Sequence, residues 1–174
     1  NNNPDDYINK SISSFFNFFQ SKFSLSTNKY KMFGHSAGAQ FTHRYMLLSN
    51  DKRISSAVIA NAGWYTFLNG ASFPYGIQES PIDITGKHIR WFMSNRTTLL
   101  IGDNDVNLDD VNSSAGAKNQ GKTRVDRAKN YFNALIRLAD KENIPFRWRY
   151  EVINGVDHDY LKMTPVAAKI LLED

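Results

Sequence analysis

The stretch Phe33-Gly34-His35-Ser36-Ala37-Gly38-Ala39 decides the fold, because it holds the pattern Gly-x-Ser-x-Gly between a strand and a helix. The sequence predicts a short strand from Tyr30 to Phe33 and a helix from Ala37 to Leu48. A serine in that context stands on a sharp turn that presents its hydroxyl above a sheet. The two glycines favour such a turn, since side chains there would clash with neighbouring backbone. The amide of Ala37 would then lie at a helix N-terminus, where it can donate to a developing oxyanion.

The pattern by itself leaves two interpretations open, a nucleophilic serine or a Gly- and Ser-rich turn without chemistry. Two later turns favour the nucleophile. Gly102-Asp103-Asn104-Asp105 follows an apolar strand predicted over Thr97 to Ile101, and Gly155-Val156-Asp157-His158 follows an alternating strand over Phe146 to Val152. Both turns lie at C-terminal strand ends, where open α/β sheets keep their sites. A serine nucleophile needs a base and an acid that orients it, and both follow here in the order acid, then His.

Helical periodicity fills the segments between the strands. A first helix is predicted from Asn3-Pro4, with a core-facing stripe of Ile8, Ile12, Phe15, Phe19 and Phe23. A later helix begins at Thr123, which can form a capping box with Asp126. Its predicted buried stripe comprises Val125, Ala128, Phe132, Leu135 and Ala139. The last helix is predicted to begin at Thr164-Pro165 and to run to the end.

Strands that alternate with helices predict an α/β fold, with a mostly parallel sheet and helices on both faces. Ser56 to Ala60 supplies a further buried strand. The 174 residues suffice for one domain and are too few to argue for two. The stretch from about 64 to 95 is aromatic, contains Pro74 and Pro81 and lacks a clear period, so it is predicted to be an irregular excursion.

Together these motifs resemble the α/β-hydrolase superfamily of serine hydrolases. The likeness is to its secreted-esterase and polyhydroxybutyrate-depolymerase-like branch, or to the related prolyl-oligopeptidase-type peptidases. It covers essentially the whole chain and is specific to the superfamily, though not to a substrate. By this resemblance Ser36 is the nucleophile, His158 the general base and Asp105 the orienting acid. The family's spacing after the glycine favours Asp105 over three solvated turn residues, Asp103, Asp109 and Asp110.

The resemblance implies hydrolysis of carboxylic esters, of a small molecule or a polymer, through an acyl-enzyme and without a cofactor. A serine peptidase and a non-catalytic relative that kept the fold remain alternatives. His35, Trp64 and Tyr65 are candidates to line a substrate pocket, with simple packing almost as well supported. His43 and His88, like His35, are otherwise predicted to be surface or packing residues.

The chain also departs from this family. Only one helix precedes the strand at Tyr30 to Phe33, whereas in the family four strands and a second oxyanion donor come before the nucleophile. We therefore expect an N-terminal segment of the same polypeptide to supply these parts. Without that segment, residues 1–174 are expected to be poorly soluble and nearly inactive.

A second motif competes with this interpretation. Residues Gly116 to Thr123 match the phosphate-loop pattern Gly-x-x-x-x-Gly-Lys-Thr, and a helix follows them. A phosphate loop needs a buried strand leading into its first glycine, but Asn107 to Ala115 is polar and acidic. Nucleotide binding is therefore the less favoured function, and a polar loop that caps the next helix is expected.

Composition and charge exclude several kinds of partner and site. The net charge is +4, but the basic residues are scattered rather than clustered on a helix face, which argues against a nucleic-acid partner. No apolar stretch is long enough to span a membrane. The chain has no cysteine, which excludes disulfides, thiolate metal sites and a Cys nucleophile. Asp103, Asp105, Asn107 and Asp109 alternate like a calcium loop, but Leu108 stands where that loop needs Gly, so no metal site is predicted.

Overall fold

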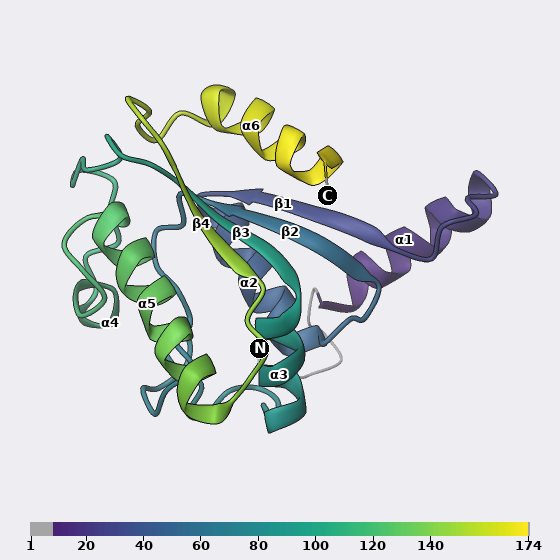
Figure 1. The fold of residues 1–174 in the computed structure, drawn as a ribbon, viewed down its shortest axis with the longest axis horizontal. Coiled ribbons are helices and arrows are strands. Elements are labelled where there is room, and N and C mark those ends of the chain that lie inside the picture. Colours follow the sequence, from purple (N-terminus) through teal and green to yellow (C-terminus); the bar gives the residue numbers. More distant parts are fainter. Residues whose placement is uncertain (1–8, 174) are drawn as a thin grey trace.

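The structure, a computed structural model, describes residues 9–173, over which strands and helices alternate (Figure 1). The strands are β1 (Tyr30–His35), β2 (Ile54–Ala60), β3 (Arg96–Gly102) and β4 (Trp148–Ile153). The helices are α1 (Asn9–Lys22), α2 (Ala37–Ser49), α3 (Gly86–Ser94), α4 (Ala115–Lys118), α5 (Arg124–Glu142) and α6 (Tyr160–Glu173). The predicted start of the first helix at Asn3-Pro4, and Ile8 of its stripe, lie outside the described residues.

The four strands form one parallel sheet in the order β1-β2-β3-β4. Each connection between neighbouring strands carries a helix, as parallel pairing requires. The central strands β2 and β3 are buried almost throughout. In β4, which pairs with β3 alone among residues 9–173, Trp148 is buried and the later residues are half-buried or exposed. Since all strands run in one direction, their C-terminal ends and the residues that follow them meet at a single edge.

Helices cover both faces of this sheet, which confirms the predicted architecture (Figure 1). Helices α2, α3 and α5 pack on one face around the larger core, and α6 lies on the other. Successive side chains of β2 point to opposite faces of the sheet. Ala57 and Ile59 therefore belong to the larger core beside α2, and Val58 and Ala60 belong to the smaller core beside α6.

Two predicted boundaries are wrong. The excursion is irregular only to residue 85, and Gly86–Ser94 forms α3 behind a capping box between Thr85 and His88. His replaces the usual Glu or Gln of that motif, which hides it in the sequence. Helix α6 begins at Tyr160, before the predicted Thr164-Pro165, because Asp159 accepts a hydrogen bond from the amide of Leu161 and Pro165 is accommodated inside the helix.

The predicted core-facing stripe of α1 is wrong for its phenylalanines. Phe15, Phe19 and Phe23 are 60%, 47% and 59% exposed, and α1 extends away from the sheet (Figure 1). Ile12 does pack against the larger core. Within residues 9–173, β1 pairs with β2 alone, so no described strand covers its outer edge.

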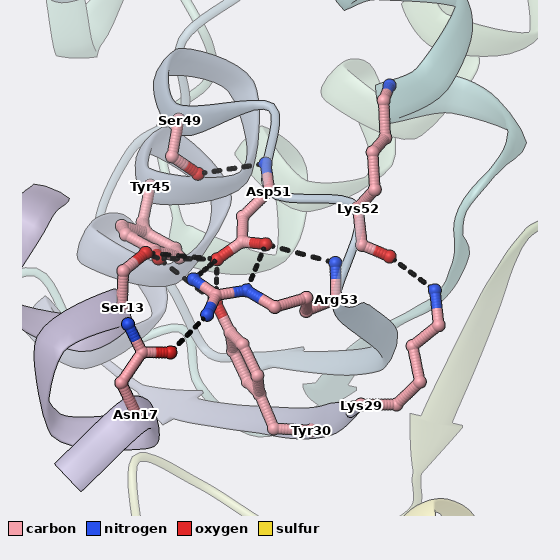
Figure 2. A network of polar contacts seen from close by, with 9 residues as sticks. All are labelled: Ser13, Asn17, Lys29, Tyr30, Tyr45, Ser49, Asp51, Lys52 and Arg53. Atoms are coloured by element: carbon pink, nitrogen blue, oxygen red, sulfur yellow. Dashed lines mark hydrogen bonds and ion pairs between the residues drawn. The ribbon is translucent and has the colours of Figure 1, made fainter. Parts of the chain in front are cut away.

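A polar network fastens α1 and β1 to the turn that precedes β2 (Figure 2). Asp51 is its centre: the Arg53 guanidinium donates to both carboxylate oxygens, at 2.9 and 2.7 Å. The Tyr30 and Ser13 hydroxyls donate to Oδ2 at 2.8 and 3.1 Å. Burial would raise the pKa of Asp51, but the hydrogen bonds from Arg53, Tyr30 and Ser13 outweigh burial and hold the pKa well below its usual value.

Replacing this carboxylate should destabilise the fold. Asp51→Asn is expected to lower the free energy of unfolding by about 1–3 kcal/mol at pH 7, since it removes the charge that Arg53 and Tyr30 face. The pKa of Asp51 is lowered by folding, so its contribution is complete above the unfolded pKa near 3.8 and is lost as the pH falls below that. Urea unfolding of the full-length protein at pH 7 and pH 3.5 measures this, with the exposed Asp140→Asn as control. An equal effect of both variants would contradict it.

Candidate active site

The turn between β1 and α2 places Ser36 at the shared edge of the sheet. Ser36 has φ 54° and ψ −117°, a conformation that non-glycine residues adopt only under strain. Two backbone hydrogen bonds hold it: the Ser36 amide donates to the Ala60 carbonyl at 2.9 Å, and the Gln40 amide donates to the Ser36 carbonyl at 3.1 Å. Ala37 is the first residue of α2, where amides have no acceptor within the helix.

The two glycines beside this turn differ in their surroundings. A Cβ at Gly34 would lie 2.2 Å from the carbonyl oxygen of Gly38, far inside van der Waals contact. A Cβ at Gly38 would meet no heavy atom within 4 Å. The expected clash therefore applies to Gly34, and the expectation is wrong for Gly38, because α2 turns its second residue away from the described structure.

Three side chains from three strand ends form one hydrogen-bonded chain. The Oγ atom of Ser36 lies 2.9 Å from Nε2 of His158, and Nδ1 of His158 lies 2.7 Å from Oδ2 of Asp105. The Asp105 carboxylate is fully buried, while the His158 side chain is 31% exposed. A neutral imidazole that donates from Nδ1 to the carboxylate has Nε2 free to accept the serine proton.

Further polar residues, which the sequence did not single out, hold the two later turns in place. Asn61 is fully buried directly after β2. Its side-chain Nδ2 donates to the Asp157 carbonyl, and its Oδ1 accepts from the Gly102 backbone amide. Oδ1 of Asp103 accepts from the Gly155 amide at 2.7 Å, so this partly exposed turn residue also braces the His158 turn. Asp109 and Asp110 are exposed. Oδ1 of Asp105 accepts from Arg124.

No family model and no curated protein matches the chain. Among solved structures, it superposes on the poly(3-hydroxybutyrate) depolymerase LpqC from Bordetella parapertussis with a TM-score of 0.90 and 29% identity, over 97% of this chain and 58% of that one. Poly(aspartic acid) hydrolase-1 from Sphingomonas sp. KT-1 gives a TM-score of 0.87 and 29% identity, over 92% of this chain and 61% of that one.

This chain has the α/β-hydrolase fold. It spans about three fifths of the length of these two structures, both of which are hydrolases by name. The two superpositions extend over almost all of this chain.

Of the three pocket candidates in this α/β-hydrolase fold, only His35 contacts the hydrogen-bonded chain. Its ring centre lies 4.7 Å from that of His158. Burial, and then the nearby His158, lower the pKa of His35 to about 4, so it is neutral at physiological pH. Its buried Nε2 has no hydrogen-bond partner among residues 9–173.

Trp64 and Tyr65 are both buried in the described structure. Tyr65 is fully buried in the larger core, with its ring stacked 4.6 Å from Tyr131, so it cannot line a pocket. Trp64 is 7% exposed and is held between Arg44 and Tyr75. His43 is fully buried as well, and the Thr66 amide donates to its Nε2. Burial lowers the pKa of His43 to about 3, so it remains neutral.

The phosphate-loop match does not form a phosphate loop. Gly116 lies inside the four-residue helix α4. The described chain forms no strand between the end of β3 at Gly102 and Gly116, so no strand leads into this glycine. Thr123 and Asp126 form the predicted capping box of α5. Over residues 9–173, no group of three or more acidic or His side chains is placed to hold a metal ion, and no helix has the length and apolarity to span a membrane.

The contrast between Gly34 and Gly38 predicts how each tolerates a methyl group. Gly34→Ala should lower the free energy of unfolding by about 1–3 kcal/mol or prevent folding, because its Cβ collides with the Gly38 carbonyl. Gly38→Ala should leave stability unchanged or slightly raised, since alanine is the better helix former. Thermal unfolding of the two full-length variants measures the difference. Equal stability of both would show that the turn does not depend on the close approach at Gly34.

Proposed function

We propose that this chain carries the catalytic residues of a serine hydrolase that cleaves carboxylic esters through an acyl-enzyme. Ser36 is the nucleophile in this proposal, His158 the general base and Asp105 the acid that orients it. The observation that carries the proposal is the chain of short contacts from Ser36 Oγ through His158 to Asp105, at 2.9 and 2.7 Å. Both distances lie in the range expected for a nucleophile and its base, and for a base and its orienting group.

The chemistry follows from this arrangement. His158 Nε2 accepts the hydroxyl proton as Ser36 Oγ attacks the ester carbonyl carbon, and the carbonyl oxygen becomes an oxyanion. Asp105 stabilises the imidazolium through Nδ1 without taking its proton. The imidazolium then protonates the departing alkoxide, which leaves an acyl group on Ser36. Water attacks the acyl carbon after giving a proton to Nε2, and the acid is released when Oγ recovers that proton.

The Ala37 amide is the proposed donor to the oxyanion. It stands at the N-terminus of α2, where the helix dipole favours negative charge. A second donor is usual in this chemistry, and losing one donor typically costs about 10²–10³ in rate. We propose that an N-terminal segment of the same polypeptide supplies it, together with strands beside β1. Three observations support this: no strand of residues 9–173 covers the outer edge of β1, the phenylalanines of α1 are exposed, and the chain spans about three fifths of these two solved structures.

The ester preference rests on the neighbour that is named for a polyester, poly(3-hydroxybutyrate). The other neighbour is named for poly(aspartic acid), whose units are joined by amides, so hydrolysis of an amide bond is the second candidate function. The same three residues serve both reactions, because each proceeds through a tetrahedral oxyanion and an acyl-enzyme.

Removal of the nucleophile or the base tests the proposal directly. Ser36→Ala and His158→Ala should each lower kcat by about 10⁴-fold or more, and the double variant should be scarcely worse, because the two residues act as a unit. Turnover of p-nitrophenyl esters by the full-length protein measures this, with circular dichroism to verify folding. A fluorophosphonate should label the wild type and not Ser36→Ala. Wild-type turnover by Ser36→Ala would refute the proposal.

The two aspartates of the acid turn should differ sharply. Asp105→Asn is expected to lower kcat by about 10³–10⁴-fold, because an amide at this place favours the wrong tautomer of His158. Asp103→Asn should change kcat less than about tenfold, since the amide oxygen can still accept the Gly155 hydrogen bond. Initial rates at saturating ester compare them. A larger loss from Asp103→Asn would assign the acid role to Asp103.

A further inference from the structure

Two buried arginines on the first turn of α5 stand out because their placement is unfavourable. Arg124 is the first residue of α5 and Arg127 lies one turn further, where the helix dipole disfavours positive charge. Both are almost fully buried, at 5% and 1% exposure, and removing guanidinium groups from water is costly. Local choices that conflict with stability concentrate at functional sites. The contacts of the two residues separate their roles.

Among residues 9–173, Arg127 hydrogen-bonds to backbone atoms alone. Its guanidinium donates to the carbonyls of Gly63, Asn112 and Gly121, at 2.6 to 2.9 Å. These carbonyls lie in three different connections, after β2, before α4 and before α5. Arg127 therefore ties loops together, and none of its hydrogen bonds within the described residues goes to Ser36, Asp105 or His158. It provides a reference for what a buried arginine of this helix does as a structural element.

Arg124 reaches the site itself. Nη1 donates to Oδ1 of Asp105 at 3.1 Å, and Nη2 donates to the Asp110 carbonyl at 2.7 Å. Oδ2 of the same carboxylate faces Nδ1 of His158. The arginine thus holds one oxygen of a fully buried carboxylate and leaves the other to the histidine, while its second contact fixes the loop that carries the carboxylate. The capping box of Thr123 and Asp126 fixes the start of α5, and with it the position of Arg124.

We propose that Arg124 is a positioning residue of this hydrolase: it fixes the orientation of the Asp105 carboxylate toward His158, and its positive charge acts on the same pair. The inference rests on the proposed function. With Oδ1 held by Arg124, Oδ2 is the oxygen left for the imidazole, which fixes the direction in which the carboxylate accepts from Nδ1. The Arg124 charge also opposes an imidazolium at His158, because both face the same carboxylate.

The charged and titratable groups around His158 allow a pH test. Its ring faces Asp105 and, beyond it, Arg124, with His35 on its other side and Asp159 next in the chain. Because burial lowers the pKa of His35 to about 4, His35 stays neutral over the pH range in which a catalytic histidine titrates. The acid limb of kcat/KM against pH reports the essential base of the free enzyme. Removal of a neighbouring positive charge should move that limb to higher pH.

The experiment compares Arg124→Met, Arg124→Lys and Arg127→Met in the full-length protein, with active sites counted by fluorophosphonate labelling. Arg124→Met should lower kcat/KM per active site by about 10–100-fold and move the acid limb up by about half a pH unit or more. Arg124→Lys keeps the charge but cannot span both Asp105 and Asp110. Its acid limb should stay where it is in the wild type, and its kcat/KM should fall by about 3–10-fold. Arg127→Met should lower stability and leave the limb in place.

Three results would overturn the inference. One is an unmoved acid limb in Arg124→Met. Another is an acid limb that moves up in Arg124→Lys by the half pH unit or more expected for a neutral residue. This result is decisive even if Arg124→Met does not fold. The third is equal behaviour of Arg124→Met and Arg127→Met, which would make Arg124 a structural residue only. Ser36→Ala separates these outcomes from failure of the proposed function, since its retained turnover would remove the serine mechanism whatever Arg124 does.

Discussion

The left-handed backbone at Ser36 is the constraint on which the candidate site depends. A serine with φ 54° is stable only where its surroundings leave it no alternative. Here β1 fixes the backbone on one side and α2 on the other, and Gly34 lets the two approach within a distance that no Cβ permits. The hydrogen bond from the Ser36 amide to the Ala60 carbonyl links the turn to β2 as well. The hydroxyl is therefore aimed by the sheet and not by a flexible loop, so its position relative to His158 is a property of the fold.

Buried charge is the second organising feature. Asp105, Arg124 and Arg127 lie within one small region between the sheet and α5, and backbone carbonyls accept further hydrogen bonds from the two arginines. Such groups are unfavourable singly and become more tolerable as a connected set, although the buried Nε of Arg124 has no hydrogen-bond partner among the described residues. In the polar network around Asp51, at the opposite end of β1, the same principle joins α1 to the sheet. The two networks anchor the two ends of the domain by the same physical means.

The sequence predicted the parallel sheet and the residues that meet at its edge because their signals are local. Gly-x-Ser-x-Gly, the apolar strand before Asp105 and the alternation before His158 can each be read from a few neighbouring residues. Arg124 and Asn61 could not be predicted, since each acts on residues distant in sequence, at separations of 19 and 96 for the bonds to Asp105 and Asp157. Tyr65 was misjudged for a related reason: proximity to a strand end does not reveal whether a ring faces solvent or the core. The phenylalanines of α1 show that periodicity identifies an apolar face but not what covers it.

The separation of the three proposed catalytic residues along the chain has a consequence for how activity arises. Ser36 and His158 are 122 residues apart, and Asp105 and His158 are 53 apart. During synthesis the strand and helix that flank Ser36 are made long before the segment that carries His158. Proteins whose contacting residues lie far apart in sequence fold more slowly than proteins with local contacts. The same dependence acts in the mature protein, where transient release of the short segment between β4 and α6 would remove His158 and leave the rest of the sheet intact. Catalysis would thus report on the docking of the final βα unit, a more local event than global unfolding.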